Sequence, residues 1–295
     1  MKKIIALILC LILILGALSG CVAGKKAMLF VEDTESASAK LLWAGFRTAA
    51  KKLGMKPVLS GLNEETSIQY TPLQVWEQDL AEQSPDVLVV AGLSDSGNYD
   101  IFRQSGLPLV AVDPIDLSDN HSVFCVYGAS PVDLARVAAE QFIDFELPSS
   151  GRIRLLYNSK DSAVADTFSS LLTDAGYNNI EITPLSGRAN ELSILNNFTE
   201  DTVAVYNASA YDTEVVDLSN LILTGITLAH LEALTANTAS SLLSRNDHAV
   251  GDAAAHAAAL ALRHKEATAV TVDPILVTAN GPEQNGAAYW LDILS

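Results

Sequence analysis

The histidines and the glycine-flanked serine loop of this sequence do not fall at the spacings that catalysis requires. His248, His256 and His264 recur every eight residues, which turns about 80° around a helix at each step and spreads them too widely for one metal ion. The loop at 92–97 misses the Gly-x-Ser-x-Gly spacing of a nucleophilic serine by one residue. We therefore expect no catalytic residue, no metal site and no cofactor, and we do not expect an enzyme.

The acidic composition argues against two classes of partner. The chain has 295 residues, with 35 acidic and 18 basic side chains and a formal net charge of −17. Nucleic-acid binding needs clustered Lys and Arg to neutralise phosphates, so we expect no nucleic-acid partner. The same sign argues against electrostatic docking on anionic lipid. The length suits one large or two medium domains with sizeable cores.

The start of the chain has the anatomy of a signal peptide, predicted over 1–20. Lys2 and Lys3 precede an apolar run over 4–18, and Leu-Ser-Gly stands directly before Cys21. A charged head, a short apolar run and small residues are typical of a secretory signal. Leu-Ser-Gly-Cys resembles the bacterial lipobox, which implies acylation of the Cys21 thiol and a protein anchored by lipid on the extracytoplasmic face of the cell membrane. The alternative is a plain signal peptide with an accidental cysteine.

From Lys26 onward, short apolar runs alternate with helical patterns. In the first half we expect strands at 27–31, 57–60, 86–91, 109–112 and 124–127, and helices at 39–53, 64–83, 99–104 and 132–145. Runs that are apolar on both faces are typical of parallel strands covered by helices on both sides. Cys125 falls inside such a run, so we expect it to be inert core.

The alternation restarts after a break at 147–151. In the second half we expect strands at 153–157, 180–184, 203–206, 221–224, 241–244 and 269–277, and helices at 163–175, 190–198, 213–219, 228–236 and 250–264. The two halves share a topology without an exact sequence repeat. The pattern predicts an α/β fold of two doubly wound, Rossmann-like lobes with parallel sheets.

Four segments carry a family resemblance, in the same order along the chain. They are 43–46, 85–90 with 94–96, 106–113, and 247–251; the most specific is 106–113, which reads Gly-Leu-Pro-Leu-Val-Ala-Val-Asp. Together they resemble the type I periplasmic-binding-protein family, in its sugar-binding, ribose-binding-protein-like branch. The resemblance implies two lobes joined by a hinge of chain crossovers. After a lipid-anchored linker at 21–26, it predicts an N-terminal lobe of 27–127 plus 246–270 and a C-terminal lobe of 128–245 plus 271–295.

The resemblance also implies a function. We expect a solute-binding lipoprotein of an ABC importer, which binds a small polar, sugar-like ligand between its lobes, contacts an ABC permease and works as a monomer. The alternative is a degenerate receptor-like lipoprotein that acts as a sensor or protein-contact subunit without sugar binding. Two departures favour the alternative: Asp166 falls where the family has a sugar-gripping Arg, and Thr227 falls where it has an Asp.

Three candidate ligand contacts follow predicted strands, where loops converge at the carboxyl ends of a parallel sheet. Asp113 either contacts the ligand or caps its own turn. Asp95 either contacts the ligand or caps the short helix that follows it. Asn207 matches a family position that meets the ligand.

Three further candidates rest more directly on the resemblance. Ser36 falls where the family often has an Asn, and Arg245 falls where it has a Gln. Trp43 lies in the first helix, from which an aromatic ring could line the ligand cleft.

Overall fold

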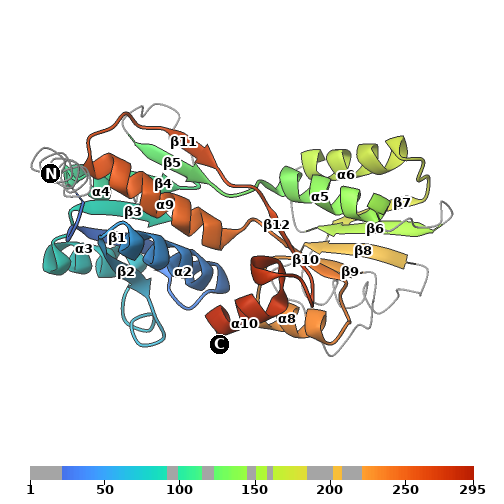
Figure 1. Ribbon diagram of the computed structural model, residues 1–295, viewed down its shortest axis with the longest axis horizontal. Helices are drawn as coiled ribbons and strands as arrows, with labels where there is room; N and C mark the ends of the chain where they lie inside the picture. Colours follow the sequence, from blue (N-terminus) through green and yellow to red (C-terminus); the bar gives the residue numbers. More distant parts are fainter. Residues whose placement is uncertain are drawn as a thin grey trace, which may run out of the picture. The chain divides into compact units, whose positions relative to one another are not determined.

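The computed structural model describes residues 22–91, 99–114, 123–144, 151–157, 162–184, 202–207 and 221–295. The chain folds into two compact units (Figure 1). Unit 1 comprises Met1–Gly128 and Asp247–Val272, and unit 2 comprises Ala129–Asn246 and Asp273–Ser295. The backbone therefore passes from one unit to the other three times. The predicted helices at 190–198 and 213–219 lie outside the described residues.

Unit 1 is built on a six-stranded, wholly parallel sheet with the order β11-β5-β4-β3-β1-β2. The strands are β1 (Lys26–Asp33), β2 (Lys56–Leu62), β3 (Val87–Ala91), β4 (Leu109–Val112), β5 (Phe124–Tyr127) and β11 (Ala269–Thr271). The helices are α2 (Ala37–Lys52), α3 (Pro72–Gln83), α4 (Tyr99–Gln104) and α9 (Asp247–Leu262). The central strands β1, β3 and β4 are buried on both faces, because helices cover the sheet on both sides, whereas the edge strand β11 is exposed.

The two faces of this sheet have different cores. Leu29 and Val89 point into a cluster shared with α2 and the alanine-rich α9. On the other face, Phe30 packs against Phe102 and Trp76, whose ring centroids lie 5.7 Å apart. The indole nitrogen of Trp76 donates to the carbonyl of Val31 at 3.0 Å, so this large side chain is buried with its polar atom satisfied.

Helices α2 and α9 lie side by side in unit 1 and approach closely through two glycines (Figure 1). A Cβ atom on Gly45 would overlap the carbonyl of His248, and one on Gly251 would overlap the carbonyl of Leu42. Neither glycine has a positive φ. Glycine is needed at these two positions because the backbones nearly touch.

Unit 2 has a second six-stranded sheet, with the order β12-β10-β9-β8-β6-β7. Its strands are β6 (Arg152–Tyr157), β7 (Ile180–Pro184), β8 (Thr202–Asn207), β9 (Leu221–Thr224), β10 (Ser241–Ser244) and β12 (Ile275–Val277). Its helices are α5 (Pro131–Asp144), α6 (Ser162–Asp174), α8 (Leu228–Thr235), α10 (Ala287–Leu294) and the short 3₁₀ helix η2 (Glu283–Asn285). Only β12 runs antiparallel to its neighbour among the described pairs.

The structure confirms the predicted α/β class and corrects three local expectations. The helix predicted from residue 64 begins at Pro72, because the Asn63 side chain accepts bonds from the next turn and Thr71 caps the helix. The strand predicted at 269–277 is two strands, β11 and β12, which belong to different units. Cys125 is only half-buried, since it lies near the β11 edge of the sheet, and the expectation of full burial is wrong.

Candidate functional site

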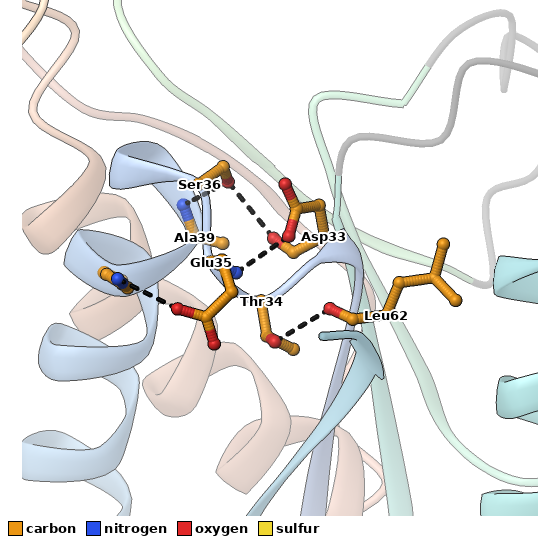
Figure 2. Close-up of polar contacts among 7 residues, drawn as sticks. Asp33, Thr34, Glu35, Ser36, Ala39 and Leu62 are labelled. Carbon is orange, nitrogen blue, oxygen red and sulfur yellow. Dashed lines mark hydrogen bonds and ion pairs between the residues drawn. The ribbon is translucent and has the colours of Figure 1, made fainter. Parts of the chain in front are cut away.

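The first loop at the carboxyl edge of the unit 1 sheet follows β1 and holds Ser36, one of the predicted site residues (Figure 2). Ser36 accepts a bond from the backbone N–H of Ala39 at 3.2 Å and donates to the carbonyl of Asp33 at 3.1 Å. The Asp33 carboxylate in turn accepts from the N–H of Glu35 at 2.8 Å. Ser36 is thus the N-cap of α2, and both of its hydroxyl bonds are internal to the loop.

Asp113 lies at the end of β4, at the same carboxyl edge, and has a structural role there. Its φ of 45° is in the left-handed region, and its N–H donates to the carbonyl of Val126 at 2.9 Å. Its Oδ1 accepts from the N–H of Gly128 at 2.9 Å. The carboxylate therefore joins the ends of β4 and β5, directly before the chain first leaves unit 1. This bond to Gly128 is not the cap of its own turn that the sequence analysis predicted, and the ligand role of Asp113 stays a prediction.

Tyr127 is a candidate that the sequence analysis missed. It is the last residue of β5 and is half-buried, beside Thr271 of β11. Burial raises the pKa of the Tyr127 phenol, and the neighbouring Cys125 thiol and Asp113 carboxylate raise it further. Tyr127 is a candidate because it ends β5 at the carboxyl edge of the sheet, next to a chain crossover. The available signal was an aromatic residue at the end of a predicted strand, next to a chain crossover.

The remaining unit 1 candidates differ in their placement. Trp43 lies on α2, is half-buried against the α2–α9 core, and has its ring centroid 6.0 Å from that of Phe46. Asp95 lies outside the described residues, as does Cys21. The structure thus brings Ser36 and Asp113 to one sheet edge and places Trp43 within α2, whereas Asp95 and Cys21 lie outside the described residues.

In unit 2, Asn207 and Arg245 both lie at the carboxyl edge of the sheet. Asn207 ends β8, and its backbone is paired in register with Tyr157, the last residue of β6. Arg245 follows β10 and is half-buried. Tyr157 is a second aromatic residue at a strand end that the sequence analysis did not select.

The loop between β9 and α8 at this edge is organised around a buried histidine. Thr227 is the N-cap of α8 and accepts from the N–H of His230 at 3.1 Å. The His230 Nδ1–H donates to the carbonyl of Gly225 at 2.9 Å, and Gly225 has the positive φ of 89° that such a turn requires. Burial lowers the pKa of His230, which leaves the imidazole neutral at pH 7.

A depression of about 520 Å³ opens at the opposite, amino edge of the unit 1 sheet. Its lining includes Leu109 and Phe124, at the starts of β4 and β5, and His264, Lys265 and Glu266, just after α9. It is therefore separate from the strand ends that carry the predicted ligand contacts.

The described residues include no cluster of metal ligands and no helix that could span a membrane. Within those ranges, no three His, Cys, Asp or Glu side chains gather as metal ligands. Among the helices the structure describes, none is long and apolar enough to cross a membrane.

The order of strands and helices in both units defines a class: the chain has the type I periplasmic-binding-protein fold, and that prediction is confirmed. A periplasmic ribose ABC transporter protein from Conexibacter woesei matches 88% of this chain and 93% of its own length, with a TM-score of 0.65 and 14% identity. A carbohydrate transporter solute-binding protein from Agrobacterium radiobacter, solved with D-arabinose, matches 90% of this chain and 99% of its own length, with a TM-score of 0.62 and 18% identity. A chain of the XylFII–LytSN complex matches 86% of this chain and 98% of its own length, with a TM-score of 0.56 and 14% identity. No family model and no curated protein matches the sequence.

Proposed function

We propose that this chain is the extracytoplasmic solute-binding lipoprotein of an ABC importer, with a small polar, sugar-like ligand and an ABC permease as its partners. The observation that carries the proposal is the agreement in fold over 88–90% of the chain with transport proteins whose described ligands include ribose and arabinose. These proteins bind solutes, and the proposal extends that role to this chain. It includes no catalytic step.

The proposed ligand contacts are Asp113, Ser36, Trp43 and Asp95 in unit 1 and Asn207 and Arg245 in unit 2. Tyr127 joins them, because it ends β5 at the same carboxyl edge of the sheet as Asp113. Sugar hydroxyls require such a mixture of acceptors and donors, with an aromatic surface for the apolar faces of the ring.

A thermal-shift screen of monosaccharides, disaccharides, cyclitols and nucleosides tests the solute role. A ligand that binds only the folded protein stabilises it by about 2.7 kcal/mol at a hundredfold excess over Kd. Asp113→Asn retains the Oδ1 acceptor for Gly128 and removes the charge, and Asn207→Ala removes one polar side chain. Each should weaken binding by about 1–3 kcal/mol. Asp174→Asn, at the exposed end of α6, is the matched control and should respond like the wild type.

The outcomes of this screen separate the possibilities. If no compound moves the unfolding midpoint of the wild type, the solute role is rejected. If a compound does so and both variants respond fully, the protein binds a solute and the proposed contacts are wrong.

The lipid anchor on Cys21 forms part of the same proposal. Metabolic labelling with a tagged fatty acid should mark the wild type and leave Cys21→Ala unlabelled, because acylation needs the thiol. Cys125→Ser leaves the Cys21 thiol, the proposed site of acylation, in place and should retain the label. A label that survives in Cys21→Ala contradicts the anchor.

One observation favours the second function, a receptor-like lipoprotein that works through protein contact. The loop at 63–70 exposes Ile68 by 84% and Tyr70 by 46%. The loop is held by its own bonds, including those from the N–H groups of Glu65 and Thr66 to the Asn63 side chain at 3.0 and 2.9 Å. We infer that Ile68 and Tyr70, which are exposed together on one ordered loop, contact a protein partner.

This second function predicts a variant that separates contact from folding. Ile68→Glu should leave the unfolding midpoint unchanged, because the side chain is almost fully exposed. It should weaken binding to a permease or histidine kinase encoded beside the gene, measured with the purified partner. Unchanged binding would exclude this loop as the contact.

A further inference from the structure

The amino edge of the unit 1 sheet carries a set of exposed basic side chains. Parallel strands begin at this edge and the helices that connect them end there, so residues far apart in sequence come together. Lys51 and Lys52 close α2, and Lys56 begins β2. Arg263 and Lys265 follow the end of α9. We call these five residues the basic edge; all five are exposed.

Acids do lie near the basic edge, among them Glu82 in the last turn of α3, but in the described part of the chain none forms an ion pair with its five members. Asp86, which lies at the same edge, is paired with Lys25 at 2.7 Å. Glu266 is an exposed acid beside Lys265 and offsets part of the charge.

The carboxyl edge of the same sheet has the opposite sign. Exposed acids there include Asp33 and Glu35 after β1, and Glu64 and Glu65 after β2. The net charge of −17 is a sum over the whole chain. It does not reveal that the fold collects basic residues at one edge of the sheet and acidic residues at the other. An argument from net charge against anionic lipid does not apply to a surface on which the bases are collected.

The chain enters the fold at the basic edge, directly after Cys21. Val22 is only 1% exposed and packs in the α2–α9 core. The N–H of Gly24 donates to the carbonyl of Gly54 at 2.8 Å, and the N–H of Lys56 donates to the carbonyl of Lys25 at 2.8 Å. Since consecutive Cα atoms are about 3.8 Å apart, a lipid on Cys21 leaves almost no spacer between the bilayer and this edge.

We propose that the basic edge of unit 1 rests on anionic phospholipid headgroups of the membrane that anchors Cys21. The inference rests on the lipid anchor of the proposed function. The acyl chains supply the affinity, and the basic edge fixes which side of unit 1 meets the membrane. Strand β1 has 8 residues, or roughly 26 Å at about 3.3 Å each, which places the acidic carboxyl edge beyond two Debye lengths of the lipid surface. The predicted ligand contacts of unit 1 then face away from the membrane.

Energy transfer from the acylated full chain to headgroup-labelled lipid tests this orientation. In a Cys125→Ser background, a donor dye is placed either at His264→Cys, beside the basic edge, or at Ile68→Cys, beyond the carboxyl edge. The protein is reconstituted into vesicles of phosphatidylcholine alone or with 30 mol% phosphatidylglycerol. We expect transfer from position 264 to exceed transfer from position 68, to rise with phosphatidylglycerol and to fall in 0.5 M NaCl.

Charge reversal provides the second arm. Lys51→Glu, Lys56→Glu and Arg263→Glu together should reduce transfer from position 264 to its value in pure phosphatidylcholine. Lys40→Glu, near the carboxyl edge, is the matched control and should change nothing. Equal transfer from the two positions, or transfer from position 264 that ignores phosphatidylglycerol, salt and the reversals, overturns the proposal.

The design keeps this failure separate from failure of the proposed function. Fatty-acid label on Cys21 is scored in the same preparation, and its absence rejects both the anchor and the orientation. Solute binding is measured on the same protein in detergent by thermal shift, and its outcome is independent of both.

Discussion

Units 1 and 2 have the same order of strands in their sheets. Different contacts join the helices inside each unit. In each, the first strand is flanked by the second and third, and the remaining strands follow outward on one side. Unit 1 joins α2 to α9 through Gly45 and Gly251, where the backbones nearly touch. Unit 2 joins α5 to α6 through Phe142 and Phe168, whose ring centroids lie 6.0 Å apart at an angle of 82°. The same topology therefore tolerates either close backbone contact or aromatic bulk between its helices.

The largest expected effect is in unit 2. Phe142→Ala removes a fully buried ring and should destabilise unit 2 by about 3–5 kcal/mol, because the lost burial and the cavity add. Hydrogen exchange with mass spectrometry measures the loss segment by segment. Protection should fall in α5, α6 and β6 while β1 and β3 keep theirs. A uniform loss of exchange protection across both units would show that they unfold together. It would contradict the view that each unit is stabilised by its own helix contacts.

Next in size is the corresponding change in unit 1. Gly251→Ala should cost about 3 kcal/mol, at the upper end for overpacking, because the added methyl group meets the Leu42 carbonyl. Helix propensity alone predicts the opposite sign, a gain of about 1 kcal/mol. The sign of the measured change in free energy of unfolding therefore shows whether overpacking or helix propensity dominates at residue 251. His256→Ala, on the exposed face of the same helix, should stay within about 0.5 kcal/mol of wild type.

Much of the fold could be predicted from local sequence. Strands β4, β5, β7, β9 and β10 and helix α4 have the predicted bounds, because each is a short apolar or amphipathic run with clear breakers on either side. The start of α3 was also readable, since Thr71 and Pro72 are a strong cap, but the helical period upstream outweighed them. The break between β11 and β12 has a local signal in Asp273-Pro274, which the predicted strand at 269–277 ignored. The assignment of the two strands to different units depends on a chain crossover and has no local signal.

The candidate site was less accessible to sequence reasoning. The bond from Gly128 to Asp113 spans 15 residues and forms only when β4 and β5 pair. The local sequence at Ser36 predicts its role as a helix cap, because the side chain of a serine directly before a helix accepts a hydrogen bond from a backbone N–H in the first turn. The ligand roles of all six candidates stay predictions: Asp113, Asn207, Asp95, Ser36, Trp43 and Arg245.

A smaller effect depends on pH and occurs in both units, since burial lowers the pKa of His230 in unit 2 and of His248 in unit 1. Burial lowers the pKa of His230 in unit 2 below its ordinary value of 6.5, so the folded state stays neutral while the unfolded chain takes up a proton. Its contribution is fully present above pH 6.5 and is lost as the pH falls towards the folded pKa. One proton limits the slope to about 1.4 kcal/mol per pH unit. Exchange measured at pH 7 and pH 6 should show this loss in α8 and β9.

His230→Asn is the variant that isolates this titration. Its side-chain amide can donate to Gly225 in place of Nδ1–H, and it carries no titrating group in this range. The pH dependence of unit 2 should flatten in the variant. A slope that persists in His230→Asn would assign the titration to another group.

The smallest expected effect compares two matched caps at the carboxyl edges. Ser36 caps α2 in unit 1 and Thr227 caps α8 in unit 2, each by accepting a backbone N–H bond three residues on, at 3.2 and 3.1 Å. Each alanine substitution should cost about 1 kcal/mol, confined to its own unit. Ser36→Asp or Thr227→Asp should restore the cap and the exchange protection. If Ser36→Ala also abolishes a solute-induced thermal shift that Ser36→Asp does not restore, the Ser36 hydroxyl contacts the ligand as well as capping α2, and the two edges differ in function as well as in packing.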